Sequence, residues 1–186
     1  EQGLNFFSLE ENKKTVLVVG GSLGAKSINE AIGNNLDQLL NAGLQLIWQT
    51  GKPYAAKSKE QIAGKQSIWV NDFITQMEFA YAAADIVVAR SGAMTVAELC
   101  VVKKPVLLVP SPFAAEDHQT LNAMQLVNKH AALLIKDAAV PDKLVPITID
   151  LAKDENWQGQ LKNNIAILGI TDADKVIANE ILKSIE

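Results

Sequence analysis

The fold is decided by the eleven residues TVLVVGGSLGA at positions 15–25. Residues 15–19 are a continuous apolar and β-branched run, which is typical of a strand buried on both faces of a parallel sheet. Gly20 and Gly21 end this run. Beyond Gly24 a helix is predicted as far as Asn41-Ala42-Gly43, because apolar residues recur at helical spacing: Ile28, Ala31, Ile32, Leu36, Leu39 and Leu40. The stretch therefore opens a βαβ unit.

The same alternation of short apolar runs and amphipathic stretches continues along the chain. It predicts further strands at 44–48, 67–70, 85–89, 105–109 and 132–135. Helices are expected at 53–63, 78–84, 93–101 and 119–129, then from 141 with breaks near Gly159 and Gly169, and after Thr171 with a stripe of Ile177, Ile181 and Ile185. Strands that alternate with helices form parallel sheets covered on both faces. The predicted fold class is therefore α/β.

The composition is that of an ordinary globular protein. The chain has 186 residues, of which 48% are hydrophobic and 20% are charged, and its one cysteine is Cys100. This length suits one domain, and a single cysteine excludes an intrachain disulfide. The net charge of −4 argues against a broad nucleic-acid-binding face but allows a local anion site. No apolar run is long enough to span a bilayer.

The first fourteen residues are expected to be a connector. The charges of Glu10, Glu11, Lys13 and Lys14 cluster directly before the first strand, which indicates a solvated segment. Because the chain does not begin with Met, we expect a fragment or a processed form.

Ligands of open parallel sheets bind beyond the carboxyl ends of the strands, so the strand-to-helix loops are the candidate sites. The first loop contains Gly21, Ser22 and Gly24. Glycines allow close approach, and the following helix offers free N–H groups and a partial positive charge, which suits a phosphate. The spacing is neither that of a dinucleotide fingerprint nor that of a P-loop. The alternative is a tight turn that merely requires glycine.

The second loop runs from Arg90 through Gly92 into the helix at 93–101. The backbone N–H groups of Ala93 to Thr95 can hold a phosphate. Thr95 and Glu98 are three residues apart and share a helix face, where a carboxylate can accept hydrogen bonds from both hydroxyls of a ribose. The alternative is structural, because Thr95-x-x-Glu98 also matches a capping box.

The third loop leads into the helix at 119–129 and carries His118, Gln119 and Asn122. Such a cluster of uncharged donors and acceptors suits sugar hydroxyls, whereas the alternative is a helix start capped by Asp117. Other chemically able residues are interpreted as structural: His130 at a helix end, Cys100 in the core, and Asp172 and Asp174 in a first turn. No grouping of histidine and cysteine has the spacing of a zinc site.

Four motifs occur in one order along the chain: residues 20–25, Asp72-Phe73-Ile74 with Met77, residues 90–98, and Asp117-His118-Gln119 with Asn122-Ala123. Together they resemble the carboxyl-terminal half of the MurG family of bacterial N-acetylglucosaminyltransferases, which convert lipid I into lipid II in peptidoglycan synthesis. The resemblance runs from Thr15 to the end of the chain. It implies the C-terminal half of a GT-B glycosyltransferase, which has a Rossmann-like parallel sheet with helices on both faces. It also implies that residues 15–186 form the domain that binds the donor UDP-N-acetylglucosamine.

The resemblance also implies a role for each motif. Gly21, Ser22 and Gly24 would meet the donor phosphates, and the backbone of Ile74 would pair with the uracil edge, with Phe73 nearby. The residues that follow Gly92 would hold phosphate and sugar, namely Ala93, Met94 and Thr95. Glu98 would take the ribose diol, and Arg90 would lie beside the nucleotide. The sugar hydroxyls would be faced by His118, Gln119 and Asn122. No metal or other cofactor is implied, because these loops would stabilise the departing UDP electrostatically.

Two departures from the family's pattern matter. Leu23 stands where the family's glycine loop usually has Gln, so any contact from that side chain is lost. The resemblance also implies that an amino-terminal half is missing, which in the family carries the acceptor site, the catalytic base and the membrane-docking surface, so no catalytic residue is assigned here. Lipid I and the inner membrane are expected to be partners through that half, at the cytoplasmic face of the bacterial inner membrane, and the isolated chain is expected to be inactive. The alternatives are a donor subunit of a split UDP-sugar glycosyltransferase and a nucleotide-binding module without transfer activity.

Overall fold

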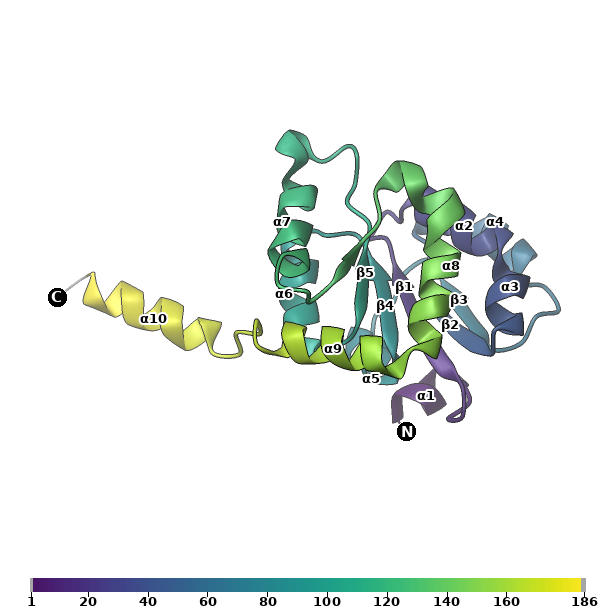
Figure 1. Cartoon of the computed structure of the whole chain (residues 1–186), viewed down its shortest axis with the longest axis horizontal. Helices are drawn as coiled ribbons and strands as arrows, with labels where there is room; N and C mark the ends of the chain where they lie inside the picture. Colours follow the sequence, from purple (N-terminus) through teal and green to yellow (C-terminus); the bar gives the residue numbers. More distant parts are fainter. Residues whose placement is uncertain (1, 185–186) are drawn as a thin grey trace.

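The computed structural model describes residues 2–184, which contain a six-stranded sheet (Figure 1). All neighbouring strands are parallel, and their order is β3-β2-β1-β4-β5-β6. The strands are β1 (Lys14–Val19), β2 (Leu44–Gln49), β3 (Ile68–Asn71), β4 (Ile86–Ala89), β5 (Val106–Leu108) and β6 (Leu133–Leu134). This is the strand order of the Rossmann fold, and the predicted α/β class is confirmed.

Helices follow the strands and cover both faces of the sheet (Figure 1). They are α1 (Gln2–Phe6), α2 (Lys26–Asn34), α3 (Leu36–Asn41), α4 (Ala55–Gln61), α5 (Met77–Ala83), α6 (Ala93–Val102), α7 (His118–Val127), α8 (Val140–Lys153), α9 (Glu155–Ala166) and α10 (Ala173–Lys183). Short 3₁₀ turns are η1 (Lys52–Tyr54), η2 (Ala115–Asp117) and η3 (Asp137–Ala139).

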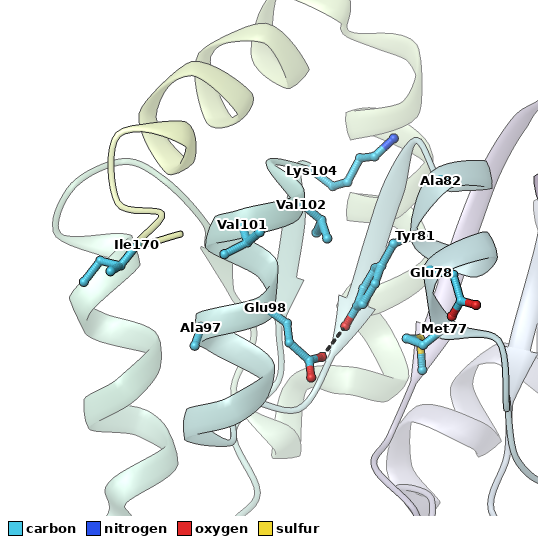
Figure 2. Close-up of a pocket in the computed structure, with 10 residues that line it drawn as sticks. All are labelled: Met77, Glu78, Tyr81, Ala82, Ala97, Glu98, Val101, Val102, Lys104 and Ile170. Atoms are coloured by element: carbon cyan, nitrogen blue, oxygen red, sulfur yellow. Dashed lines mark hydrogen bonds between the residues drawn. The ribbon is translucent and has the colours of Figure 1, made fainter. Parts of the chain in front are cut away.

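The core is divided by the sheet into two layers. Because side chains alternate along a strand, Val16 and Val18 of β1 pack with α2, α3 and α8 on one face, while Leu17 and Val19 pack with α5, α6 and α7 on the other. All four side chains are buried, which explains why the strand is a continuous apolar run. Between α5 and α6 the second face keeps a cavity of about 680 Å³ (Figure 2).

Two breaks between helices differ from the sequence prediction. The helix expected up to Asn41 is interrupted at Asn35, whose side-chain amide donates to the carbonyl of Ala31 at 2.8 Å and so competes with the helical backbone pattern. The break expected near Gly159 lies at Asp154, whose carboxylate caps α9 by accepting from the Trp157 N–H at 2.9 Å. Gly159 is an interior residue of α9.

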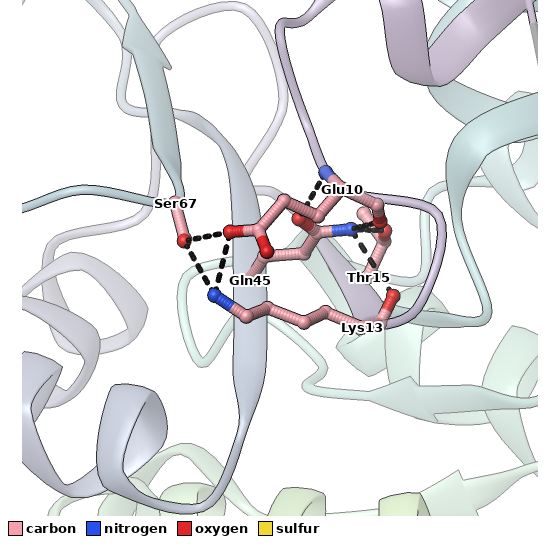
Figure 3. A network of polar contacts seen from close by, with 5 residues as sticks. All are labelled: Glu10, Lys13, Thr15, Gln45 and Ser67. Atoms are coloured by element: carbon pink, nitrogen blue, oxygen red, sulfur yellow. Dashed lines mark hydrogen bonds and ion pairs between the residues drawn. The ribbon is translucent and has the colours of Figure 1, made fainter.

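The expectation that the first fourteen residues form a solvated segment is wrong for its apolar part. Phe7 is 2% exposed and packs edge-on against Trp69, with ring centroids 4.8 Å apart. The polar part is also fixed, because the Gln45 side chain accepts from the Glu10 N–H at 2.9 Å and donates to the Glu10 carbonyl at 2.7 Å (Figure 3). The prediction gave weight to the charges at 10–14 and overlooked the apolar residues before them.

The last helix, α10, extends away from the sheet (Figure 1). Its apolar residues are exposed, Ile177 by 60% and Ile181 by 58%. The third member of that stripe, Ile185, lies outside the described residues.

The two glycines at positions 24 and 159 make a matched pair for testing the fold. Gly24 has φ +75°, and a Cβ there would stand 1.9 Å from the Thr50 carbonyl oxygen, whereas a Cβ on Gly159 would meet nothing within 4 Å. We expect Gly24→Ala to lower the free energy of unfolding by more than about 2 kcal/mol. Gly159→Ala should raise it by roughly 0.5–1 kcal/mol, because helical alanine costs less backbone entropy. Urea denaturation measures both values, and equal effects would contradict the geometry.

Candidate functional site

A cavity of about 640 Å³ lies at the carboxyl ends of the central strands. It is formed by the loops that follow β1, β4 and β5, together with η3. The three loops singled out in the sequence therefore meet in space. The lining residues are Gly20, Gly21, Gly24, Ala25, Lys26, Ser27, Glu30, Arg90, Gly92, Thr95, Ser111, Phe113, Gln119 and Asp137.

The glycines of the loop after β1 allow a tight turn and leave the backbone of the loop accessible. Gly24 donates its N–H to the Gly21 carbonyl at 3.0 Å, and both glycines have positive φ. Gly24 also sits against Thr50, so the structural alternative of a turn that requires glycine holds at this position. A Cβ on Gly21, by contrast, would meet nothing within 4 Å, and Ser22 is exposed. Ala25 caps α2 without a side-chain hydrogen bond, which leaves the first N–H groups of that helix for a ligand.

Gln49, which sequence reasoning missed, connects this loop to the one after β3. Its side chain donates to the Gly21 carbonyl at 3.0 Å and accepts from the Ile74 N–H at 2.9 Å. The N–H of the buried Ile74 is therefore donated within the protein, whereas no hydrogen bond among residues 2–184 reaches its carbonyl oxygen. Phe73 beside it is 49% exposed. The available signal was a polar residue directly after the strand predicted at 44–48.

Helix α6 begins at the cavity with Gly92 as its N-cap and no side-chain cap. Thr95 is the third and Glu98 the sixth helical residue, so the two cannot form a capping box and that alternative is wrong. The N–H groups of Ala93, Met94 and Thr95 are the ones that an α-helix leaves without an internal partner. This end of α6 is therefore a site of positive potential beside Gly92.

Glu98 lies one turn further along α6 and faces α5. Its Oε2 accepts a hydrogen bond from the Tyr81 hydroxyl at 3.0 Å (Figure 2). Glu98 and Tyr81 both line the cavity between α5 and α6, which is otherwise mainly apolar, with Met77, Val101 and Val102 among its walls. Burial, together with the charge of Glu98, raises the pKa of Tyr81 well above its ordinary value, so the phenol remains a donor.

Arg90 lines the cavity at the carboxyl ends of the strands, and its guanidinium is hydrogen-bonded within the protein. Its Nη1 donates to the carbonyls of Val109 and Pro110 and pairs with Asp137 Oδ1 at 2.6 Å. Ser27 completes the cluster, because it accepts from Arg90 Nη2 at 3.2 Å and donates to Asp137 at 2.6 Å. Asp137 and Ser27 were not predicted, although Asp137 follows the strand expected at 132–135 as a ligand-loop residue would.

The third loop is held by the residues proposed to face a sugar. Gln119 accepts from the Ser111 N–H at 2.9 Å, and Asn122 donates to the Ser91 carbonyl at 3.1 Å. Gln119 lines the cavity, whereas the exposed His118 has its Nδ1 2.6 Å from the Ala115 carbonyl oxygen. Asp117 occupies the N-cap position of α7 with a left-handed backbone and no side-chain cap, so the alternative of a helix start capped by Asp117 is wrong.

Two kinds of feature are absent from residues 2–184. No group of three or more His, Cys, Asp or Glu side chains in that range is placed to hold a metal ion. None of the helices described there has the length and apolar character needed to cross a membrane.

Comparison with known proteins decides the family. The model of the glycosyltransferase family 28 C-terminal domain matches residues 15–177. The chain belongs to this family. A transferase of Phocaeicola vulgatus named UDP-N-acetylglucosamine--N-acetylmuramyl-(pentapeptide) pyrophosphoryl-undecaprenol N-acetylglucosamine transferase is 46% identical over 98% of the chain and 50% of its own length. The protein of that name from Parabacteroides distasonis is 44% identical over 100% of the chain and 51% of its own length.

The same relationship appears in a solved glycosyltransferase structure. The crystal structure of Acinetobacter baumannii MurG superimposes with a TM-score of 0.83 and 27% identity, over 97% of this chain and 53% of that one. The resemblance to the C-terminal half of a GT-B glycosyltransferase is therefore confirmed. The chain spans about half the length of the curated relatives it matches.

The Arg90 cluster makes a specific prediction for the stability of this family 28 domain. The side chains of Arg90 and Asp137 are only 13% and 22% exposed. We expect Arg90→Met to lower the free energy of unfolding by roughly 2 kcal/mol, because it removes the cationic partner of the half-buried Asp137 carboxylate, which keeps only Ser27 as a donor, and leaves two carbonyls without theirs. The matched control is Lys183→Met, which removes a pair with Glu180 that is 68% and 67% exposed and should cost less than about 0.5 kcal/mol. Similar losses in urea denaturation of the two variants would contradict a structural role for Arg90.

Proposed function

We propose that this chain binds the donor UDP-N-acetylglucosamine, and that the whole protein transfers N-acetylglucosamine from it to lipid I, giving lipid II. The observation that carries the proposal is identity of about 45% along nearly the whole chain with transferases of that name. The cavity at the carboxyl ends of the strands supports it, because it joins a glycine loop to two uncapped helix N-termini.

Each part of the donor can be assigned to one of these features. Its phosphates would lie between Gly21, Ser22 and Gly24 and the N-terminus of α6, where N–H groups and helix dipoles favour negative charge. The ribose would reach Glu98, one turn along α6. The uracil would then lie toward Phe73 and the free carbonyl of Ile74, and the sugar toward Gln119 and His118.

The chemical contribution of this half is stabilisation of the leaving group. As the bond from the anomeric carbon to the phosphate breaks, negative charge grows on UDP, and fixed N–H groups stabilise it without reorganising. Arg90 adds little net charge there because Asp137 neutralises it. The acceptor and its base would be supplied by the half of the protein that this chain does not span, at the cytoplasmic face of the bacterial inner membrane.

The base preference of binding tests the proposal. UDP should bind the purified chain more tightly than ADP or GDP, because the resemblance to the family assigns the loop at Phe73 and Ile74 to the uracil edge. Isothermal titration calorimetry with the three nucleotides measures this preference. Equal affinities for the three nucleotides would contradict the assignment of Ile74 to the uracil edge and would favour a general nucleotide-binding module.

The isolated chain should transfer no sugar. Catalysis needs a base within hydrogen-bond reach of an acceptor held in near-attack geometry. The two histidines of the chain do not meet this need, since His118 is on the donor side and His130 follows α7, at the opposite edge of the sheet. An assay with labelled UDP-N-acetylglucosamine and a lipid I analogue should give no product above background, and robust turnover would refute the division of labour proposed here.

A further inference from the structure

A buried tyrosine holds the exposed carboxylate of Glu98. Tyr81 is 8% exposed and belongs to the core layer formed by α5, α6 and α7, whereas Glu98 is exposed on α6. The two meet in the hydrogen bond of 3.0 Å from the Tyr81 hydroxyl to Glu98 Oε2 (Figure 2). A side chain fixed by packing is therefore tied to one that would otherwise be mobile.

This arrangement matters because of the freedom of a glutamate side chain. Its terminal torsion is broad, and ordering a long side chain on binding costs affinity. A carboxylate offers about four lone-pair sites. Tyr81 occupies one of them, and among residues 2–184 no hydrogen bond reaches Oε1 of Glu98. Enough acceptor capacity remains for two hydroxyl donors.

We propose that Tyr81 is a positioning residue, which holds the Glu98 carboxylate in the orientation that receives the 2′- and 3′-hydroxyls of the donor ribose. This inference rests on the proposed function, since it assumes that a ribose reaches Glu98. The phenol suits the task because it stays protonated: burial and the neighbouring carboxylate both raise the pKa of Tyr81. It donates a single proton and so fixes the carboxylate without competing for the diol.

A purely structural role is the alternative, in which the bond only ties α5 to α6. The chain offers a matched control for it in Tyr54, which is also 8% exposed and donates its hydroxyl to Gln61 Oε1 at 3.2 Å. Tyr54 belongs to η1 and lines neither of the two cavities. Tyr54→Phe and Tyr81→Phe each remove one buried hydroxyl and keep the ring.

The experiment measures by calorimetry the affinity of single and double variants of the chain for UDP and for 2′,3′-dideoxy-UDP. Tyr81→Phe should weaken UDP binding about threefold to tenfold, and Tyr54→Phe should leave it unchanged. Glu98→Gln should weaken UDP binding roughly tenfold to hundredfold. With 2′,3′-dideoxy-UDP the Tyr81→Phe effect should vanish, because no diol reaches the carboxylate. In the Glu98→Gln background, Tyr81→Phe should add no further loss.

The outcomes separate this inference from the proposed function. If Glu98→Gln weakens UDP binding while Tyr81→Phe does not, the positioning role is overturned and the donor site stands. If Tyr81→Phe weakens UDP and its dideoxy analogue equally, the role is structural and the inference also fails. If UDP does not bind, or binds independently of Glu98, the proposed function itself is contradicted.

Discussion

Strand β1 lies between β2 and β4, and the helices that leave the two central strands pass to opposite faces of the sheet. Ile28 and Ile32 of α2 pack in the layer with Val16 and Val18, whereas Leu99 of α6 packs in the other layer. Where successive helices diverge in this way, neither covers the strand ends and a crevice remains. The cavity that contains Gly21, Arg90 and Thr95 is that crevice. The position of the crevice follows from strand order alone. The loops determine only which side chains and N–H groups line it.

The loops around the crevice are held by polar side chains, because turns expose carbonyl and N–H groups that apolar packing cannot satisfy. Gln49 makes hydrogen bonds to two loops, and Arg90 donates to two carbonyls of a third loop. Asn122 donates to the carbonyl of Ser91. Among residues 2–184 no buried side-chain nitrogen or oxygen is left without a partner. Several residues whose chemistry suggests ligand contact are thus occupied by the protein itself. The groups left accessible are mainly backbone in the crevice, and the exposed carboxylate of Glu98 in the cavity between α5 and α6.

This division explains how far the sequence could predict the structure. The strands were predicted within one or two residues because each is an apolar run between turn residues. The three candidate loops meet at one cavity because the carboxyl ends of parallel strands share one edge. The interruption at Asn35 was missed, since the apolar spacing continues through Leu36 and Leu39 into α3. The pairs that fix side chains are separated by 47 residues for Arg90 and Asp137 and by 17 for Tyr81 and Glu98. No local pattern encodes such pairs, so the roles given to Arg90, Asn122 and the Ile74 N–H were inferred without their competing partners.

The charges around the crevice indicate how an acidic protein can hold an anion. The titratable residues of its lining are Lys26, Glu30, Arg90 and Asp137, two of each sign, and Arg90 is paired closely with Asp137. Side-chain charges therefore nearly cancel, so the positive potential that this crevice offers to an anion comes from the N–H groups at the starts of α2 and α6. The field of a helix terminus fades within about one turn, so the anion must come very close to the backbone. Gly21 and Gly92 put no side chain in the way of such an approach, and each stands beside a helix without a side-chain cap.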